Sequence, residues 1–268
     1  MTTVHPDASG QAEAATTPTR IAEPGEVRLR FDGVSKTFPD GTHALADISF
    51  DVRAGEFVTV VGPSGCGKST ILKLATGLIP KSSGTIELPD ENVGYVFQDA
   101  TLLPWRTVAR NVELFCELHD VPKADRARLA AEAIELVGLS GFEKHHPKRL
   151  SGGMKMRVSL ARSLTLNPGL FLFDEPFGAL DEITRERLND EVLRLFLHEC
   201  FGGLFITHSI NEAIFLSTRV LVMSARPGRM IAEFDVPFAY PRRPELRFEP
   251  EFAELGGQVS EALRGGHT

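Results

Sequence analysis

A run of residues in the first third of the chain has the types and the spacing of a phosphate-binding loop. It consists of Gly62, Pro63, Ser64, Gly65, Cys66, Gly67, Lys68, Ser69 and Thr70, of which the first eight match the pattern G-x-x-x-x-G-K-[ST]. The glycines let backbone N–H groups turn toward an anion, Lys68 reaches the outer phosphates, and Ser69 can ligate Mg²⁺. We interpret Cys66 as a small filler, although a helix N-terminus would lower the pKa of its thiol. The loop predicts a nucleotide site and leaves kinases and GTPases open.

Two carboxylates follow an apolar run later in the chain. Residues 170–173 are Leu, Phe, Leu and Phe, and Asp174 and Glu175 come next. A buried strand would deliver both acids to the carboxyl edge of a sheet, where ligands bind in open α/β folds. Asp174 suits Mg²⁺, and Glu175 suits the polarisation of an attacking water. Together with the loop, the acids predict a Mg²⁺-dependent nucleotide site.

A second Gly-rich segment contains Ser151, Gly152 and Gly153 within the run Leu-Ser-Gly-Gly-Met. Serine is a good N-cap, and the glycines leave bare N–H groups at a helix start, so this segment could bind an anion as well. The run resembles the signature motif of ABC ATPases, which other P-loop proteins lack. The resemblance implies that the segment caps the ATP of a second subunit, in a head-to-tail homodimer with two shared sites.

Further residues match positions of the same family and take their expected roles from the resemblance. Phe38 matches the aromatic residue that stacks on adenine, and Gln98 matches the glutamine that senses Mg²⁺ and the attacking water. Asp181 resembles the residue that communicates across the dimer, and His208 resembles the switch histidine that contacts the γ-phosphate. The catalytic residues so implied are Glu175, His208 and Gln98, and the Mg²⁺ ligands are Ser69, Gln98 and Asp174.

Three segments narrow the resemblance to importer ATPases of the nitrate, sulfonate and taurine group. They are residues 101–105 (TLLPW), 177–181 (FGALD) and 223–229 (MSARPGR). The implied partners are membrane permease subunits and, indirectly, a periplasmic or lipid-anchored solute-binding protein, with this chain peripheral on the cytoplasmic face of the inner membrane. The departures from the family's commonest residues, which remove no phosphate ligand, are Met154, Met156 and Ser209.

The loop after Gln98 is expected to lie on the surface. Pro104 disfavours helix at Leu103 and removes a backbone donor. Exposed apolar clusters mark interfaces, and aromatic anchors dominate binding energy there. We therefore expect Trp105, the single tryptophan of the chain, to contact the permease. The alternative is that Trp105 folds into a core, as large aromatic residues usually do.

Apolar periodicity supplies the elements that must position these residues. Alternating residues predict antiparallel strands at 27–31 and 48–52, and continuous apolar runs predict buried strands at 57–61, 170–173, 204–207 and 220–223. Three helices are expected from apolar residues at helical spacing. The first buries Ile71, Leu74, Ala75 and Leu78. The second buries Leu129, Ala133, Leu136 and Val137 and ends at Gly138, and the third buries Leu188, Val192, Leu195 and Phe196. Alternating strands and helices predict an α/β fold with a mostly parallel core sheet, an antiparallel β subdomain and a helical subdomain at about 100–160.

Composition limits the remaining possibilities. With 29 Lys and Arg against 36 Asp and Glu, the chain lacks the basic footprint of a nucleic-acid binder. Residues 1–26 are expected to form a flexible extension, 27–237 the ATPase domain, and 238–268 a C-terminal tail with a short amphipathic stretch. The alternatives are an ABC-type ATPase in DNA repair or on ribosomes, uncoupled from transport, and a P-loop kinase or GTPase, against which the signature segment argues.

Overall fold

Two sheets form the framework of the protein. The computed structural model describes residues 25–89 and 92–266, so almost all of the predicted N-terminal extension lies outside the described residues. The smaller sheet is antiparallel, in the order β2-β1-β4. Its strands are β1 (Val27–Thr37), β2 (His43–Arg53) and β4 (Ser83–Glu87). Of the alternating apolar residues that predicted β1 and β2, all but the half-buried Val27 are buried, which agrees with the predicted antiparallel β subdomain.

The larger sheet has the order β5-β6-β7-β3-β8-β9 and is parallel except for its last pair, β8 and β9. Its strands are β3 (Phe57–Val61), β5 (Val93–Val96), β6 (Leu170–Asp174), β7 (Gly202–Thr207), β8 (Arg219–Met223) and β9 (Met230–Asp235). The central strands β3 and β7 are buried along their whole length, as expected for parallel strands with both faces covered. The predicted mostly parallel core sheet is confirmed.

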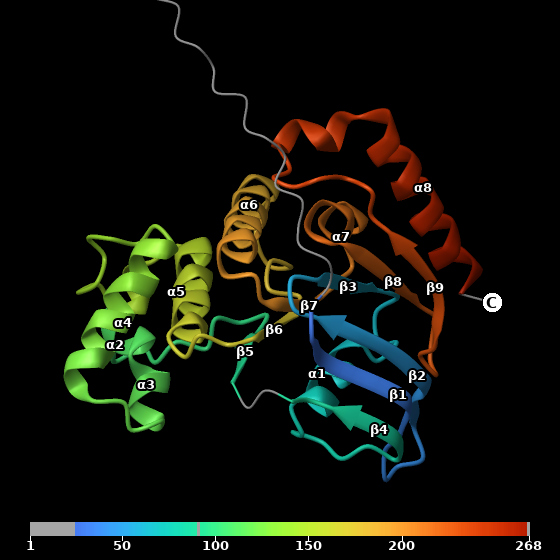
Figure 1. Cartoon of the computed structure of the whole chain (residues 1–268), viewed down its shortest axis with the longest axis horizontal. Coiled ribbons are helices and arrows are strands. Elements are labelled where there is room, and N and C mark those ends of the chain that lie inside the picture. Colours follow the sequence, from blue (N-terminus) through green and yellow to red (C-terminus); the bar gives the residue numbers. More distant parts are fainter. Residues whose placement is uncertain (1–24, 90–91, 267–268) are drawn as a thin grey trace, which may run out of the picture.

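Helices cover this sheet on both faces (Figure 1). On one face lie α6 (Glu182–Glu199) and α7 (Ile210–Leu216), and their apolar residues share one hydrophobic cluster with Phe57 and Phe205. On the other face α1 (Lys68–Ala75) packs between the two sheets, in a second cluster with residues of β1 and β2. The helix that follows the phosphate loop is therefore clamped by both sheets.

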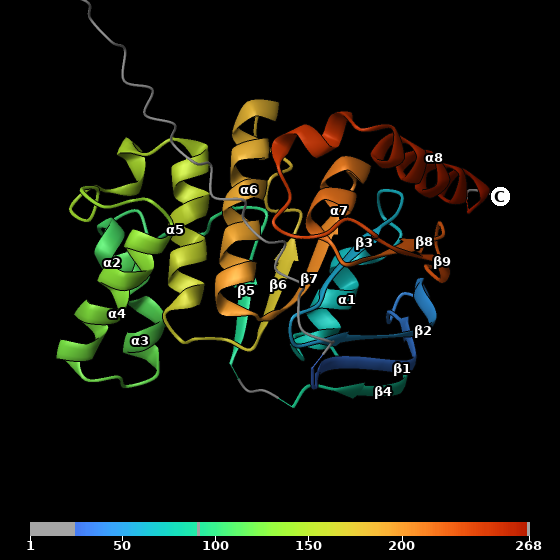
Figure 2. The ribbon, with the colours of Figure 1, turned by 45° about the horizontal axis from the view of Figure 1, so that its top comes forward.

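A group of helices stands to one side of the sheets (Figure 2). Its members are α2 (Val108–Val112), α3 (Leu114–Leu118), α4 (Lys123–Leu136), the short 3₁₀ helix η1 (Pro147–Arg149) and α5 (Gly152–Leu164). This arrangement confirms a helical subdomain that carries the signature segment. Helix α5 connects it to the sheet, because α5 packs against both α6 and β5.

Two helix predictions were wrong in detail. Helix α1 ends at Ala75, and Leu78, which was expected on its buried face, is 64% exposed beyond Gly77, whose φ of +69° ends the helix. The buried stripe of α4 contains Ala130, Ala133, Ile134 and Val137, whereas the predicted Leu136 is 44% exposed.

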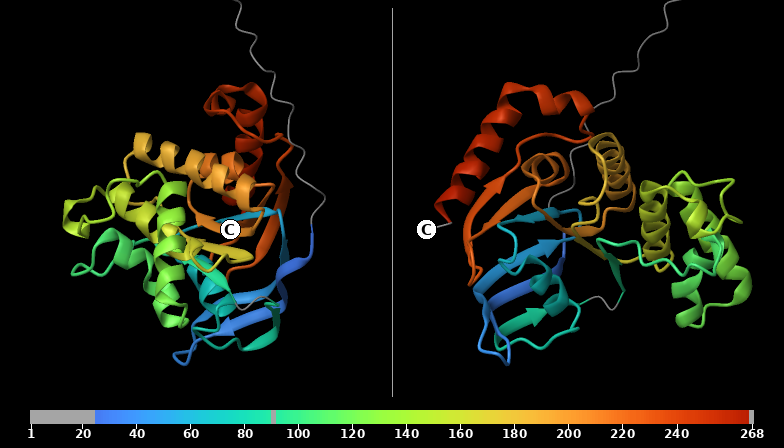
Figure 3. Two further views of the ribbon diagram at one scale, coloured as in Figure 1. Left: turned by 60° about the vertical axis from the view of Figure 1, so that its left-hand side comes forward. Right: turned by 180° about the vertical axis from the view of Figure 1, so that it is seen from behind.

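The C-terminal residues form a 3₁₀ helix, η2 (Pro244–Phe248), and a helix, α8 (Pro250–Gly265). Helix α8 packs on α7, β8 and β9 and buries Phe252, Leu255 and Val259. Figure 3 shows it lying along the outer side of the sheet. Within the described residues, no helix has the length and apolar character needed to cross a bilayer.

Candidate functional site

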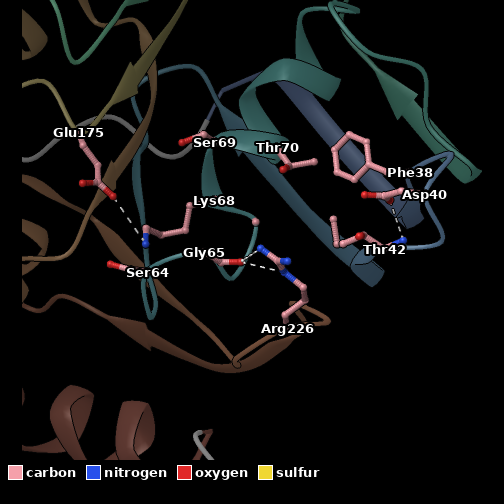
Figure 4. A pocket seen from close by; sticks show the side chains of 12 residues that line it. Phe38, Asp40, Thr42, Ser64, Gly65, Lys68, Ser69, Thr70, Glu175 and Arg226 are labelled. Atoms are coloured by element: carbon pink, nitrogen blue, oxygen red, sulfur yellow. Dashed lines mark hydrogen bonds and ion pairs between the residues drawn. The ribbon is translucent and has the colours of Figure 1, made fainter.

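The phosphate loop joins β3 to α1, as its sequence predicted. Gly67, the N-cap of α1, has a φ of +112°, and a Cβ there would lie 2.6 Å from Leu45 Cδ2 and 3.1 Å from the Ala44 carbonyl oxygen. A side chain is excluded both by conformation and by space. The loop borders a cavity of about 400 Å³ (Figure 4). The cavity is lined by Phe38, Asp40, Thr42, Ala44, Ser64, Gly65, Gly67, Lys68, Ser69, Thr70, Glu175 and Arg226.

Lys68 is held at the base of this cavity with only 5% of its side chain exposed. Its Nζ donates to the carbonyl oxygens of Gly62 (2.9 Å) and Pro63 (3.1 Å) and lies 3.6 Å from Glu175 Oε1. An ammonium buried with a single flexible carboxylate and two carbonyls is a strong point charge for an incoming phosphate. Lys68 thus lies where an incoming phosphate would meet its charge, and its role stays a prediction.

Ser69 and Asp174 come together from α1 and β6. Ser69 Oγ donates to Asp174 Oδ1 at 2.7 Å, and Tyr95 OH donates to Asp174 Oδ2 at 3.3 Å. Burial, and then the nearby Asp174 charge, raise the pKa of Tyr95, so its hydroxyl stays a donor. A hydroxyl beside a carboxylate suits Mg²⁺, which binds through one or two protein oxygens plus substrate phosphates. Among residues 25–89 and 92–266, no group of three acidic, His or Cys residues could hold a metal ion by itself.

Three polar residues converge beside Gly178. His208 Nδ1 lies 3.2 Å from Glu175 Oε2, because Glu175 follows β6 and His208 follows the neighbouring parallel strand β7. A Cβ on Gly178 would lie 3.8 Å from both Gln98 Nε2 and His208 Cε1 and 3.5 Å from the Glu175 carbonyl oxygen. Gln98, Glu175 and His208 therefore surround one small space at the carboxyl edge of the sheet. The glycine leaves that space open to a water or a phosphate oxygen.

Sequence reasoning missed the residues behind His208. Glu212, one helical turn further on, is buried and hydrogen-bonds to Thr207 Oγ1, which also accepts from the backbone N–H of Ser209 at 3.0 Å. Burial raises the pKa of Glu212, and Arg185 Nε on α6 lies 3.7 Å from its Oε1. This network fixes the backbone on both sides of His208. The four-residue spacing to an acidic residue was the available signal.

Arg226 also lines the cavity, on the side of Phe38, and sequence reasoning did not assign it to the site. Phe38 follows β1, and Lys36 Nζ lies 5.1 Å from the centre of its ring. Opposite, Arg226 donates from Nη2 (2.8 Å) and Nε (3.2 Å) to the Gly65 carbonyl oxygen. Arg226 follows β8, so no local pattern links it to the phosphate loop.

One expectation about the loop was wrong. Cys66 is buried, and burial raises the pKa of its thiol instead of lowering it. Its Sγ would be only 2.9 Å from a Cβ on Gly62. Cys66 thus packs as a filler inside the loop, as its position suggested.

The signature segment lies at the start of α5 and does not line the cavity of its own chain. Ser151 is the N-cap, accepting from the Met154 N–H at 3.2 Å, and both Ser151 and Gly152 are exposed. A Cβ on Gly153 would lie 2.8 Å from Thr184 Cγ2 of α6. Asp181 caps α6 by accepting from the N–H of that same Thr184 at 2.9 Å. Signature segment and Asp181 therefore form one exposed surface.

Trp105 is exposed to 72%, which excludes its burial in the core of this chain. The predicted surface loop is confirmed for Trp105, whereas Leu102 is partly buried against the main cluster. The loop is held from below by Asn111, which accepts from the Leu103 N–H at 2.7 Å and donates to carbonyl oxygens of Leu103, Arg106 and Thr107. A buried amide thus fixes a loop whose tip is in solvent.

Comparison with known proteins agrees with this geometry. Residues 45–178 match the family model described as ABC transporter. The chain is 43% identical to the taurine import ATP-binding protein TauB of Rhizobium johnstonii, with 82% of this chain and 89% of that protein covered. It is 41% identical to an aliphatic sulfonates import ATP-binding protein, SsuB, of Bacillus cereus, covering 89% and 97%.

Solved structures show the same architecture. The dimeric post-hydrolysis ATP-binding cassette MJ0796, bound to ADP and Pi, is 29% identical and superposes with a TM-score of 0.68 over 78% of this chain and 99% of that chain. The cbiO1 protein of Clostridium perfringens, part of the cbiONQ transporter complex, has a TM-score of 0.73 at 23% identity, over 87% and 99% of the two chains. The second likeness concerns the fold alone.

Proposed function

Since the chain belongs to the ABC transporter family, we propose that it is the ATP-hydrolysing subunit of an importer, a translocase that drives a small solute through a separate membrane permease. The observation that carries this proposal is the cavity bordered by the phosphate loop and lined by Lys68, Ser69 and Glu175. Asp174 is hydrogen-bonded to Ser69, and His208 lies beside Glu175. These groups supply what phosphoryl transfer requires, which is charge neutralisation, a metal site and a base.

Each group has a part in hydrolysis. Backbone N–H groups of residues 62–70 and Lys68 hold the phosphates, and Phe38 stacks on the base. Mg²⁺, held by Ser69 and Asp174 with Gln98 nearby, would neutralise phosphate charge. Glu175 accepts a proton from a water molecule while the water oxygen attacks the γ-phosphorus. The bond between the γ-phosphorus and the β,γ-bridging oxygen breaks, which releases ADP. His208, oriented by its contact with Glu175 Oε2, donates to the γ-phosphate.

The active form is a head-to-tail homodimer. Ser151 and Gly152 are exposed at the start of α5, Gly153 follows them, and none of the three lines the cavity of its own chain, so they cap the ATP of the partner. Asp181 lies on the same surface and communicates between the two sites. The dimeric MJ0796 cassette, which covers 78% of this chain, supports this assembly.

The partners and the location follow from the relatives. The names of two relatives, a taurine importer and an aliphatic sulfonate importer, support a sulfonate-like solute. A periplasmic or lipid-anchored binding protein would deliver it to the permease. The chain then lies peripherally on the cytoplasmic face of the inner membrane, with the exposed Trp105 loop against the permease. Residues 27–237 form the ATPase domain, and the acidic net charge of −7 argues against a nucleic-acid partner.

The test is reconstitution. The purified chain with Mg²⁺ and ATP should release free phosphate, and hydrolysis should rise when the chain is assembled with its permease in vesicles and a binding protein loaded with a sulfonate. Recovery of the γ-phosphate on another organic product would instead indicate a kinase. Phosphate release that no permease or solute stimulates would favour an ATPase uncoupled from transport.

A further inference from the structure

The loop that follows β8 closes one side of the nucleotide cavity. Gly228 donates to the Ala44 carbonyl at 2.9 Å, and its own carbonyl accepts from the Ala46 N–H at 3.0 Å. A Cβ on Gly228 would lie 2.3 Å from the Cys66 carbonyl oxygen. The backbone of residues 224–229 is thus pressed against the phosphate loop and β2 by contacts that do not involve the side chain of Arg226.

Arg226 extends from this fixed backbone into the cavity. Its Nη2 and Nε both donate to the Gly65 carbonyl oxygen, at 2.8 and 3.2 Å. Figure 4 shows the guanidinium between Gly65 and the turn that carries Asp40 and Thr42. A guanidinium has five N–H donors, and within the described residues only those two nitrogens of Arg226 have a protein acceptor. The donors on Nη1 have no protein acceptor among the described residues, and Arg226 lines the cavity.

The charge of Arg226 has no carboxylate partner at ion-pair distance in the part of the chain that the structure describes. The nearest acidic influence is Asp40, whose pKa is lowered first by its bond from the Thr42 N–H and, as a smaller effect, by Arg226. Lys68 and Arg226 are the two cations among the described residues that line the cavity. One lies at its base and the other at its side, toward Phe38.

We propose that Arg226 is an affinity-determining residue of the nucleotide site, which is oriented by the Gly65 carbonyl and donates from Nη1 to the phosphate nearest the sugar. The proposal rests on the ATP-binding function above. In that function the base lies on Phe38 and the outer phosphates lie at Lys68. The phosphate next to the sugar then lies between these two residues, in the part of the cavity that Arg226 lines. Guanidinium groups suit phosphate oxygens because they offer parallel donors with a delocalised charge.

The experiment compares full-length Arg226→Gln and Arg226→Lys with Arg229→Gln, an exposed arginine of the same loop that does not line the cavity. Calorimetric titration should show ATP and ADP bound about tenfold more weakly by Arg226→Gln, as the loss of one charged hydrogen bond implies. The loss should be equal for both nucleotides, because both carry the sugar-proximal phosphate. The Lys variant should lie in between, and Arg229→Gln should match the wild type.

Two further readouts separate ligand contact from loop support. The wild-type affinity should fall more steeply with NaCl than that of Arg226→Gln, since a charge contact with phosphate has been removed. The melting temperature without nucleotide should be the same in both proteins. Three results would overturn the proposal. They are an unchanged nucleotide affinity in Arg226→Gln, an affinity loss for ATP but not for ADP, and a melting temperature low enough to account for the affinity loss. A wild-type chain that binds no nucleotide would instead refute the proposed function.

Discussion

Two Gly-rich helix starts in this chain share a chemistry but differ in their surroundings. The start of α1 faces a cavity lined by Lys68, Ser69 and Glu175, with Asp174 of β6 hydrogen-bonded to Ser69. The start of α5, with Ser151 and Gly152, is exposed, lies on the same surface as Asp181 and does not line that cavity. Both offer N–H groups to an anion, yet only the first has the groups for chemistry.

The exposure of the α5 start indicates that this half of the nucleotide site needs a second surface. A helix start with open N–H groups and no enclosing wall binds a phosphate weakly in water, because solvent screens it. It becomes effective when a second surface brings the ligand and excludes water. We therefore expect folding to build the first half of the site and association with a second chain to build the other half.

Removal of Lys68 tests the enclosed half and should have the largest effect. In Lys68→Ala the outer phosphates lose the only ammonium at the base of the cavity, so ATP hydrolysis should fall by at least about a hundredfold, the scale of losing a buried charged contact. Phosphate release measures it. Lys73→Ala, on the exposed side of the same helix, is the matched control, and normal turnover in Lys68→Ala would refute the site.

Glu175→Gln separates binding from hydrolysis. The variant keeps the shape of the side chain and the Asp174–Ser69 contact but removes the base, so ATP should bind without being split and should hold two chains together. Size-exclusion chromatography with ATP and Mg²⁺ should show a dimer. Glu132→Gln, on the exposed face of α4, should behave as wild type, and a monomeric Glu175→Gln protein would contradict either the dimer or the base.

A mixing experiment asks whether the two halves belong to different chains. Ser151→Arg blocks the signature segment and Lys68→Ala disables the phosphate loop, so each protein alone should be inactive. A mixed dimer carries both lesions in one shared site and leaves the other intact, and the mixture should regain part of the activity. Mixing Lys68→Ala with Glu175→Gln leaves a lesion in each site and should regain none. Recovery in both mixtures, or in neither despite ATP-dependent mixed dimers, would argue against sharing in trans.

The loop before α2 offers a smaller contrast, between the buried Asn111, which holds the loop, and the exposed Trp105 within it. Truncating the buried Asn111 leaves the N–H and carbonyl groups of residues 103–107 without their partner, and Asn111→Ala should lower the free energy of unfolding by about 2–4 kcal/mol. Trp105→Ala removes only an exposed ring and should change it by less than about 0.5 kcal/mol. Urea unfolding measures both, and equal losses would show that the ring is part of the core.

The fluorescence of Trp105 gives the smallest signal and the most direct test of docking. As the single tryptophan, it should emit at long wavelength in the isolated chain and shift to the blue on assembly with the permease, because the ring leaves water. Trp105→Ala should weaken that assembly while sparing ATP binding. An emission that stays unchanged on assembly would place the docking surface elsewhere.

Sequence reasoning succeeded where the chemistry is local. The phosphate loop and the pair Asp174 and Glu175 are contiguous, and the strands that carry them are short apolar runs, so their positions could be predicted. Arg226 and Glu212 escaped because their roles depend on contacts across the fold, to Gly65 and to Thr207. The buried face of α4 was predicted in part: Ala133 and Val137 are buried as expected, whereas Ala130 and Ile134 are buried in place of Leu129 and Leu136. The roles of Gln98, Ser151 and Asp181 stay predictions.

The order of the central sheet has a consequence for synthesis of the chain. Strand β3, which carries the phosphate loop, pairs on one side with β7, where Phe57 is opposite Gly203, and on the other with β8, where Val58 is opposite Arg219. Neither neighbour exists when the loop leaves the ribosome, and such long-range pairings close slowly. The nascent segment therefore exposes an apolar strand until residues beyond 223 have emerged, and ATP can stabilise the fold only after that moment. Translation delays placed between β3 and β8 should extend the period in which the chain depends on chaperones.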